Sequence, residues 1–322
     1  MEYRRSGKWG LKLPAISLGL WQNFGGARDY KEAFEILGYA FDQGVTHFDL
    51  ANNYGPPPGS AEELFGKVLS REFKAYRDEI IVSSKAGWQM WPGPYGDLGS
   101  RKYLIASCDQ SLKRLGLDYV DIFYSHRYDP NTPLEETMSA LAQLHREGKA
   151  LYVGISSYRE PQTREAHRIL KEMGVPCLIH QPSYSILNRW IEADKTIDAC
   201  GELGMGVIAF SPLQQGILSG KYNERKGDLS GTRASENVSL SAAKLEPRIL
   251  KAVEALGGIA RKRGQTLVQL ALAWVLRRPE MTSALIGVRT LDQLKDCLGA
   301  LKNLKLDASE IAAIDEATKD AR

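Results

Sequence analysis

Short apolar runs alternate with amphipathic stretches along almost the whole chain. The runs are rich in β-branched residues, and the stretches between them carry apolar positions three or four residues apart, as on one face of a helix. Leu104, Cys108, Leu112 and Leu115 form one such face. Alternation of this kind indicates parallel strands joined by crossover helices. Eight strands are predicted, over residues 16–20, 46–49, 80–85, 119–126, 151–156, 177–181, 206–211 and 283–287.

The longest connection separates the last two predicted strands. The earlier strands end about one βα unit apart, but residues 212–282 are too many for a single unit. Their first part, residues 223–246, is polar and rich in Gly and Ser, which predicts a long loop over a functional site. Two helices are predicted after this loop, over residues 249–263 and 267–276.

Two folds show this alternation: a closed (β/α)8 barrel and a doubly wound sheet. The doubly wound fold needs G-x-G-x-x-G between its first strand and the next helix, so that the backbone can approach a pyrophosphate. The nearest match, at Gly204, Gly206 and Ala209, comes before a strand instead of after one. This order favours an α/β fold of the (β/α)8 TIM barrel type, formed by residues 1–322 as a single domain.

Both ends of this barrel have a predicted cover. Residues 3–5 and 11–13 flank Gly7 and Gly10, which predicts an N-terminal β-hairpin that closes the bottom. Residues 87–99 form a second long connection, rich in aromatic residues and proline. It is expected at the C-terminal mouth, where barrel enzymes carry out their chemistry.

The composition is that of an ordinary globular protein, with 43% hydrophobic and 25% charged residues. The net charge of +3 is spread over segments of mixed sign, so we expect no nucleic-acid partner. The chain has no targeting segment and no apolar run of about 18 residues, so we expect a cytoplasmic protein without a membrane partner. The four cysteines lie far apart and the five histidines form no metal motif, so no metal site is expected.

Polar residues stand at the ends of three consecutive predicted strands. Asp49 ends the second strand, Lys85 the third and His126 the fourth, while Tyr54 follows shortly after Asp49. In a closed barrel all strand ends converge on one mouth, so these four side chains are expected to meet. Each alone also fits a structural role, such as a cap or an ion pair. Their occurrence at successive strand ends favours one shared site.

The four residue types suit the reduction of a carbonyl by hydride. Such a reaction leaves an alkoxide, which needs a proton from a donor whose pKa lies near the working pH. A free tyrosine, with a pKa of about 10, is too weak an acid. The Lys85 ammonium is expected to lower the pKa of Tyr54, with Asp49 holding the ammonium in place. His126 is expected to donate a hydrogen bond to the carbonyl oxygen.

Longer segments around these residues resemble the aldo-keto reductase superfamily. The resemblance covers essentially the whole chain. The sequence is similar in particular to the branch that contains bacterial L-glyceraldehyde 3-phosphate reductases and the potassium-channel β-subunits. The most specific segments are YGPPPGSAEE at residues 54–63, MWPGPYG at residues 90–96 and HQPSY at residues 180–184.

The resemblance implies a catalytic tetrad and a nicotinamide cofactor. The tetrad matches at Asp49, Tyr54, Lys85 and His126 without departure. The family binds NADPH extended across the barrel mouth. At Cys297 relatives commonly carry an Asn that contacts adenine, so the chain departs from the pattern there. The positions implied to bind NADPH are Trp21, Asp49, Ser156, Gln181, Phe210, Ser211, Pro212, Leu213, Gln215, Gly216, Lys221, Arg233, Gly287, Arg289, Gln293 and Asp296.

These positions divide by the part of NADPH that the resemblance assigns to them. Ser156 and Gln181 would hold the carboxamide, and Phe210 would stack on the nicotinamide ring. Residues 211–216 would line the pyrophosphate, with Lys221 and Arg233 folded over it from the long loop. The adenosine 2′-phosphate would lie among Arg289, Gln293 and Asp296. Arginine suits such a phosphate, although Arg289 alone would equally fit a surface charge.

The implied function is the NADPH-dependent reduction of small aldehydes, such as L-glyceraldehyde 3-phosphate or methylglyoxal. Two alternatives stay open: an NADP(H)-binding regulatory subunit of the channel β-subunit type, and a reductase of a larger ketone or a sugar. His126 stands where the channel subunits have Asn, which favours an enzyme. Relatives also imply a homo-oligomer, a tetramer or larger. The residues expected around the substrate are Trp21, Tyr54, Trp88, Trp91 and His126, of which Trp88 and Trp91 equally fit loop packing.

Overall fold

Eight parallel strands close into a barrel within residues 1–224 and 245–321, which are the residues that the computed structural model describes. The strands follow the chain order around the barrel, and the last strand pairs with the first. The predicted (β/α)8 barrel is confirmed, with strand bounds within two residues of those predicted. The strands are β3 (Ile16–Gly19), β4 (His47–Asp49), β5 (Ile81–Ala86), β6 (Val120–Ser125), β7 (Ala150–Ser156), β8 (Cys177–Gln181), β9 (Gly206–Phe210) and β10 (Met281–Ile286).

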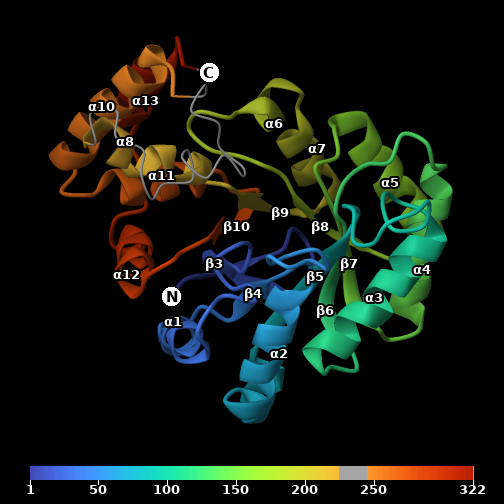
Figure 1. Ribbon diagram of the computed structural model, residues 1–322. Helices are drawn as coiled ribbons and strands as arrows, with labels where there is room; N and C mark the ends of the chain where they lie inside the picture. The colour runs from blue at the N-terminus through green and yellow to red at the C-terminus, as the bar shows by residue number, and fades with distance from the viewer. Residues whose placement is uncertain (225–244, 322) are drawn as a thin grey trace.

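Helices surround the barrel and cover the outer face of its strands (Figure 1). The predicted helices after the long loop are confirmed as α10 (Pro247–Lys262) and α11 (Leu267–Val275), whereas residues 225–244 of that loop lie outside the described residues. The other helices are α1 (Tyr30–Asp42), α2 (Ser60–Arg71), α3 (Arg101–Leu115), α4 (Leu134–Arg146), α5 (Glu160–Glu172), α6 (Trp190–Ala193), α7 (Thr196–Leu203), α8 (Lys221–Glu224), α12 (Leu291–Gly299) and α13 (Ala308–Thr318), with 3-10 turns η1 (Lys74–Glu79), η2 (Gln214–Ser219) and η4 (Ala300–Lys302).

Local residues determine where these helices begin and end. The Ser100 hydroxyl accepts a hydrogen bond from the backbone N–H of Tyr103 at the start of α3, and Gly116 ends the same helix with a φ of 66°. The Thr290 hydroxyl accepts in the same way from the Gln293 N–H at the start of α12. These caps define the first turn of each helix.

Most strand residues are buried, because helices cover the outer face and side chains fill the barrel interior. Every residue of β6 is buried, for example. A large apolar core lies between strands and helices and includes Trp274 on α11. A smaller cluster lies inside the barrel and consists of Leu13, Ile122, Tyr124, Leu178, Ile179, Ile208 and Leu285.

A two-stranded antiparallel hairpin, β1 (Tyr3–Arg5) and β2 (Lys12–Pro14), covers the N-terminal end of the barrel. Leu13 from β2 belongs to the cluster inside the barrel. The Ser6 hydroxyl donates to the Leu178 carbonyl at 3.3 Å, and the Lys8 N–H donates to the Gly204 carbonyl at 3.1 Å. The predicted hairpin and its position at the barrel bottom are thus confirmed.

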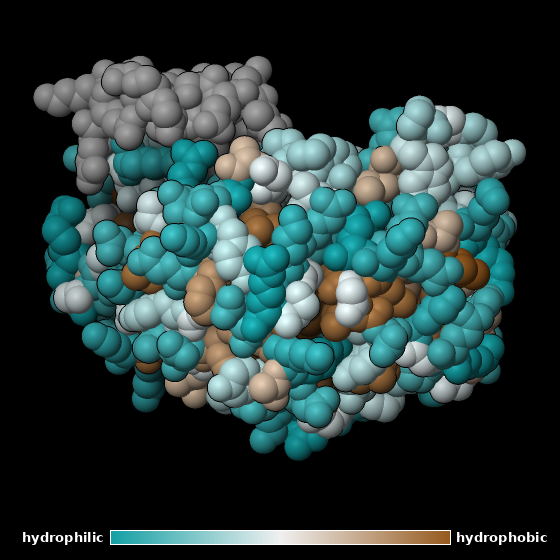
Figure 2. Space-filling view, turned by 60° about the horizontal axis from the view of Figure 1, so that its bottom comes forward, coloured by the Kyte–Doolittle hydropathy of each residue, from teal (hydrophilic) through white to brown (hydrophobic). Residues whose placement is uncertain are grey.

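The surface of the protein is mostly polar on the face that Figure 2 shows. On this face, hydrophobic residues show between hydrophilic ones (Figure 2). Within residues 1–224 and 245–321, no helix combines the length and the apolarity that a membrane span requires.

Replacing Gly7 with Ala should destabilise the protein by about 2 to 3 kcal/mol. Gly7 has a φ of +56°, and a Cβ there would lie 2.1 Å from the Gly204 carbonyl oxygen, so the hairpin would have to move off the barrel. The free energy of unfolding from chemical denaturation measures the loss. Gly10→Ala is the matched control, because a Cβ at Gly10 meets nothing within 4 Å. Equal stability of the two variants would contradict this account of the hairpin.

Candidate active site

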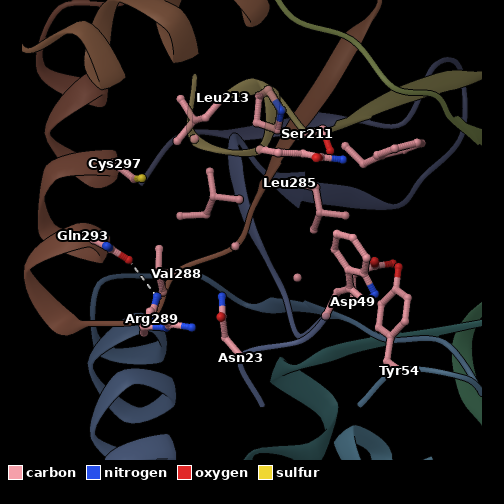
Figure 3. A pocket seen from close by; sticks show the side chains of 18 of the residues that line it. Asn23, Asp49, Tyr54, Ser211, Leu213, Leu285, Val288, Arg289, Gln293 and Cys297 are labelled. Carbon is pink, nitrogen blue, oxygen red and sulfur yellow. Dashed lines mark hydrogen bonds between the residues drawn. The ribbon is translucent and has the colours of Figure 1, made fainter. Parts of the chain in front are cut away.

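A cavity of about 670 Å³ opens at the C-terminal ends of the barrel strands. It extends from Asp49 and Tyr54 on one side to Arg289, Gln293 and Cys297, on and just before α12, on the other (Figure 3). This volume is in the range of small-molecule sites. Strand ends contribute Gly19 from β3, Asp49 from β4, Gln181 from β8, Phe210 from β9 and Ile286 from β10.

Asp49 and Lys85 form an ion pair at the base of this cavity. Lys85 Nζ donates to Asp49 Oδ2 at 2.5 Å and to the Leu50 carbonyl at 2.6 Å. Both charged side chains are fully buried. Burial lowers the pKa of Lys85, and the Asp49 carboxylate opposes this shift. Because either charge alone would be strongly unfavourable in this position, the two residues act as a unit.

Tyr54 lies against this ion pair. Lys85 Nζ is 5.0 Å from the centre of the Tyr54 ring. The Tyr54 carbonyl accepts hydrogen bonds from the N–H groups of Gly59 and Ala61, which ties the tyrosine to the start of α2. Burial, followed by the Asp49 charge, raises the pKa of the phenol well above 10. This direction is opposite to the one expected from the sequence, because an ionised phenol would be a second buried anion beside Asp49.

His126 follows β6 and completes the group of four. Its backbone N–H donates to the Ala86 carbonyl at 2.9 Å, and its ring meets the Tyr54 ring edge-on, with 5.9 Å between ring centres. Burial, with the charges of Lys85 and Arg127, lowers the pKa of His126 well below 6.5, so the imidazole is neutral at pH 7. Its Nδ1 is buried and has no hydrogen-bond partner among the described residues.

Most of the other sequence-predicted positions line the same cavity. Ser156 does not, because its hydroxyl donates to the Gln181 carbonyl at 2.7 Å, and the neighbouring Ser157 lines the cavity instead. Arg233 lies outside the described residues. The predicted cofactor positions found in the cavity wall, besides Asp49, are Trp21, Gln181, Phe210, Ser211, Pro212, Leu213, Gln215, Gly216, Lys221, Gly287, Arg289, Gln293 and Asp296.

The end of the cavity near α12 carries the features of an anion site. Arg289 lies at this end (Figure 3), and Lys221 is a second cation in the cavity wall. The backbone N–H of Arg289 donates to Gln293 Oε1 at 2.8 Å, seen as the dashed line in Figure 3. The positive end of the α12 dipole adds to the two cations. Asp296 also lines this end, but its carboxylate accepts from Thr266 and Gln269 at 2.8 and 2.9 Å.

Three non-glycine residues in the cavity wall have left-handed backbone conformations. Ser157, Ser211 and Gln215 have φ values of 60°, 52° and 56°. Such conformations cost free energy and are concentrated at functional sites. The strain marks this part of the barrel mouth as shaped for a ligand.

The tryptophans predicted around a substrate take different positions. Trp21 and Trp88 line the cavity next to Tyr54 and His126. Trp91 packs on Tyr103, with 5.1 Å between ring centres, and is not part of the cavity wall. For Trp91 the structure therefore supports loop packing.

Some residues that line the cavity are not among the site residues predicted from the sequence. Asn53 precedes Tyr54, and its side-chain oxygen is buried without a hydrogen-bond partner among the described residues; this adjacency could have identified it. Asn23, Ser157 and Ser219 are ordinary polar loop residues in the sequence. Apolar wall residues have no feature that separates them from core positions, and these are Val268, Leu285, Ile286 and Val288.

Comparison with known proteins agrees with this geometry. The chain matches the Aldo/keto reductase family over residues 15–319. It is 53% identical over 322 residues to L-glyceraldehyde 3-phosphate reductase of Escherichia coli K12, an alignment that covers 99% of this chain and 93% of the relative. It is 36% identical over 308 residues to a probable voltage-gated potassium channel subunit beta of Arabidopsis thaliana, covering 95% of this chain and 93% of that protein. The chain is therefore a member of the aldo/keto reductase family and an oxidoreductase.

Proposed function

We propose that this protein reduces small aldehydes to alcohols, with NADPH as the hydride donor and Tyr54 as the proton donor. One observation carries the proposal: Lys85, paired with Asp49 at 2.5 Å, lies 5.0 Å from the Tyr54 ring at the wall of a cavity. A phenol beside a buried ammonium is suited to releasing its proton to a developing anion.

The residues that line the cavity suit a nicotinamide dinucleotide. Gln181 lines the cavity beside Asp49, and Phe210 lines the same cavity; an amide and an aromatic face suit a carboxamide and a nicotinamide ring. Arg289 lines the end near α12 (Figure 3), and Lys221 also lines the cavity; both cations suit phosphates. Aldo-keto reductases generally use nicotinamide cofactors, and the donors and cations present here fit such a group.

The chain's own residues handle the substrate oxygen. A bound reduced nicotinamide supplies the hydride that the carbonyl carbon accepts. The neutral His126 can donate a ring N–H to the carbonyl oxygen, and Tyr54 then releases its phenolic proton to the alkoxide. Burial raises the pKa of Tyr54 and so makes it a weaker acid, but the proton transfer stays favourable because an alkoxide is a stronger base than a phenolate. The Lys85 ammonium stabilises the phenolate that remains.

The substrate proposal takes its size from the site and its chemical class from a relative. Trp21, Trp88 and Asn53 surround the cavity next to Tyr54 and His126, and so leave a partly aromatic pocket for a small carbonyl compound. The relative from Escherichia coli is named for L-glyceraldehyde 3-phosphate. We therefore propose L-glyceraldehyde 3-phosphate as a substrate, with methylglyoxal as a second small aldehyde. We also propose that the protein acts in the cytoplasm and as a homo-oligomer.

A regulatory role is the second candidate, because the chain is also 36% identical to a probable potassium channel β-subunit. His126 favours the enzyme, since it supplies an N–H for the substrate oxygen. Multiple turnover of an aldehyde by the purified protein, in the absence of any partner, is the expected result. A single turnover or none would favour the regulatory role.

Replacing Tyr54 with Phe should lower kcat for aldehyde reduction by about 10²- to 10⁴-fold, because the alkoxide loses its proton donor. NADPH binding, followed by fluorescence, should remain within about twofold, since the ring is retained. The measurement is NADPH oxidation with methylglyoxal and with glyceraldehyde 3-phosphate.

Tyr95→Phe is the matched control for this variant. Tyr95 lies in the connection over the barrel mouth and its side chain is exposed. The same chemical change there should leave kcat unaltered. Full turnover by the Tyr54→Phe protein would contradict the proposed role of Tyr54 as the proton donor.

Replacing Arg289 with Ala should weaken NADPH binding by about ten- to a hundredfold and leave NADH binding nearly unchanged, because a charge-assisted contact to the 2′-phosphate is lost. Dissociation constants for both cofactors test this. Lys295→Ala is the control, since Lys295 lies on α12, the helix that follows Arg289, and faces Tyr39 instead of the cavity. Equal losses for NADPH and NADH would exclude Arg289 from 2′-phosphate recognition.

A further inference from the structure

A chain of hydrogen bonds runs from Asp49 down into the barrel interior. Asp49 Oδ1 accepts from the Ser83 hydroxyl at 2.6 Å, and Ser83 Oγ lies 2.9 Å from His47 Nε2. His47 Nδ1 lies 2.9 Å from Ser17 Oγ, which lies 2.7 Å from Ser283 Oγ. The residues come from β4, β5, β3 and β10, and all five side chains are fully buried.

The direction of every hydrogen bond in this chain follows from Asp49. The Ser83 hydroxyl has one proton and donates it to the carboxylate, so it must accept from His47 Nε2–H. Burial lowers the pKa of His47 to about 4, so the ring is neutral at pH 7 and its Nδ1 accepts. Ser17 therefore donates to His47 and accepts from Ser283. All four donors point toward the carboxylate, an arrangement in which each hydrogen bond strengthens the next.

This chain does not reach solvent, because Ser283 at its far end is fully buried. It therefore cannot deliver protons to the site from the bulk. What it can do is fix the rotation of the carboxylate, whose other oxygen binds Lys85. Gln181 Nε2 also donates to Asp49 Oδ1, at 3.1 Å, but Gln181 lines the cavity and is one of the groups proposed to bind the nicotinamide. When Gln181 binds the cofactor, Ser83 remains as the donor to Oδ1.

We propose that Ser83 and His47 are positioning residues, which hold the Asp49 carboxylate in the orientation that keeps the Lys85 ammonium beside Tyr54. The proposal rests on the function proposed above. Neither residue touches substrate or cofactor; both act through Asp49. A carboxylate that loses its buried donors is free to rotate away from Lys85, and a small misplacement of a catalytic group is costly in rate.

The adjacent residue of β5 provides a matched control. Ser84 is equally buried, and its hydroxyl donates to Glu62 at 2.6 Å, while Arg114 pairs with the other Glu62 oxygen at 2.7 Å. Ser83 and Ser84 thus each donate to a buried carboxylate that is paired with a cation. Of the two carboxylates, only Asp49, which accepts from Ser83, lines the cavity.

The test compares Ser83→Ala with Ser84→Ala in the full-length protein. We expect kcat to fall ten- to a hundredfold in Ser83→Ala and less than about twofold in Ser84→Ala. The Kd for NADPH should stay within about twofold in both variants, because neither side chain lines the cavity. Thermal unfolding measured in parallel should show similar losses of stability. Ser83→Thr, which keeps the hydroxyl, should restore most of the turnover.

The pH profile of kcat gives a second readout that a purely structural role would not move. Asp49 opposes the lowering of the Lys85 pKa by burial. With Asp49 less well held, Lys85 should lose its proton at a lower pH, so the alkaline decline of kcat should move to lower pH in Ser83→Ala alone. The titratable and charged groups around Lys85 are Asp49, Glu62, Tyr54, Tyr124, His126 and His47.

Two further variants complete the experiment. If Ser83→Ala does not fold, Ser17→Ala replaces it in the comparison, with an expected two- to fivefold fall in kcat and a pH shift in the same direction. Tyr54→Phe separates the two proposals. If it loses turnover while Ser83→Ala, or Ser17→Ala in its place, behaves like Ser84→Ala, the positioning role is overturned and the proposed function stands. If Tyr54→Phe retains turnover, both are overturned.

Discussion

The candidate active site depends on the buried ion pair between Asp49 and Lys85. Taking Asp49 and Lys85 out of water costs more than an exposed pair can return, so the pair is tolerable only where further hydrogen bonds satisfy both ions. The Leu50 carbonyl, the Ser83 hydroxyl and the Gln181 amide provide those hydrogen bonds. The strand ends of a closed barrel bring these groups together from three different parts of the chain, and this explains why the site is at the mouth.

The sequence was sufficient for the fold because its signal is repeated and local. Each βα unit carries a buried apolar run and an amphipathic helix, and the hairpin carries two glycines between short strands, so errors were confined to strand ends. The four residues of the candidate site were found because strand ends in a barrel must converge. Asp49, Lys85 and His126 needed only a correct assignment of where each strand stops.

Other features could not be predicted because they depend on the environment of each side chain. Whether Lys85 or burial dominates the pKa of Tyr54 depends on how far the phenol is removed from water, and the sequence expectation had the direction reversed. Trp88 and Trp91 look alike in the sequence, yet only Trp88 faces the cavity. Ser156 and Ser157 also look alike in the sequence, yet the Ser156 hydroxyl donates to the Gln181 carbonyl while Ser157, in a left-handed conformation, lines the cavity.

The left-handed conformations of Ser157, Ser211 and Gln215 bear on how this protein could be engineered. Glycine would relieve the local strain at each position, yet it would also release the wall of the cavity from its fixed shape. A search for thermostable variants would therefore do better to leave these three positions alone and to work on the helices outside the barrel. In this fold, the helices outside the barrel are available for stabilising substitutions, whereas the cavity wall at the barrel mouth serves the recognition of a ligand.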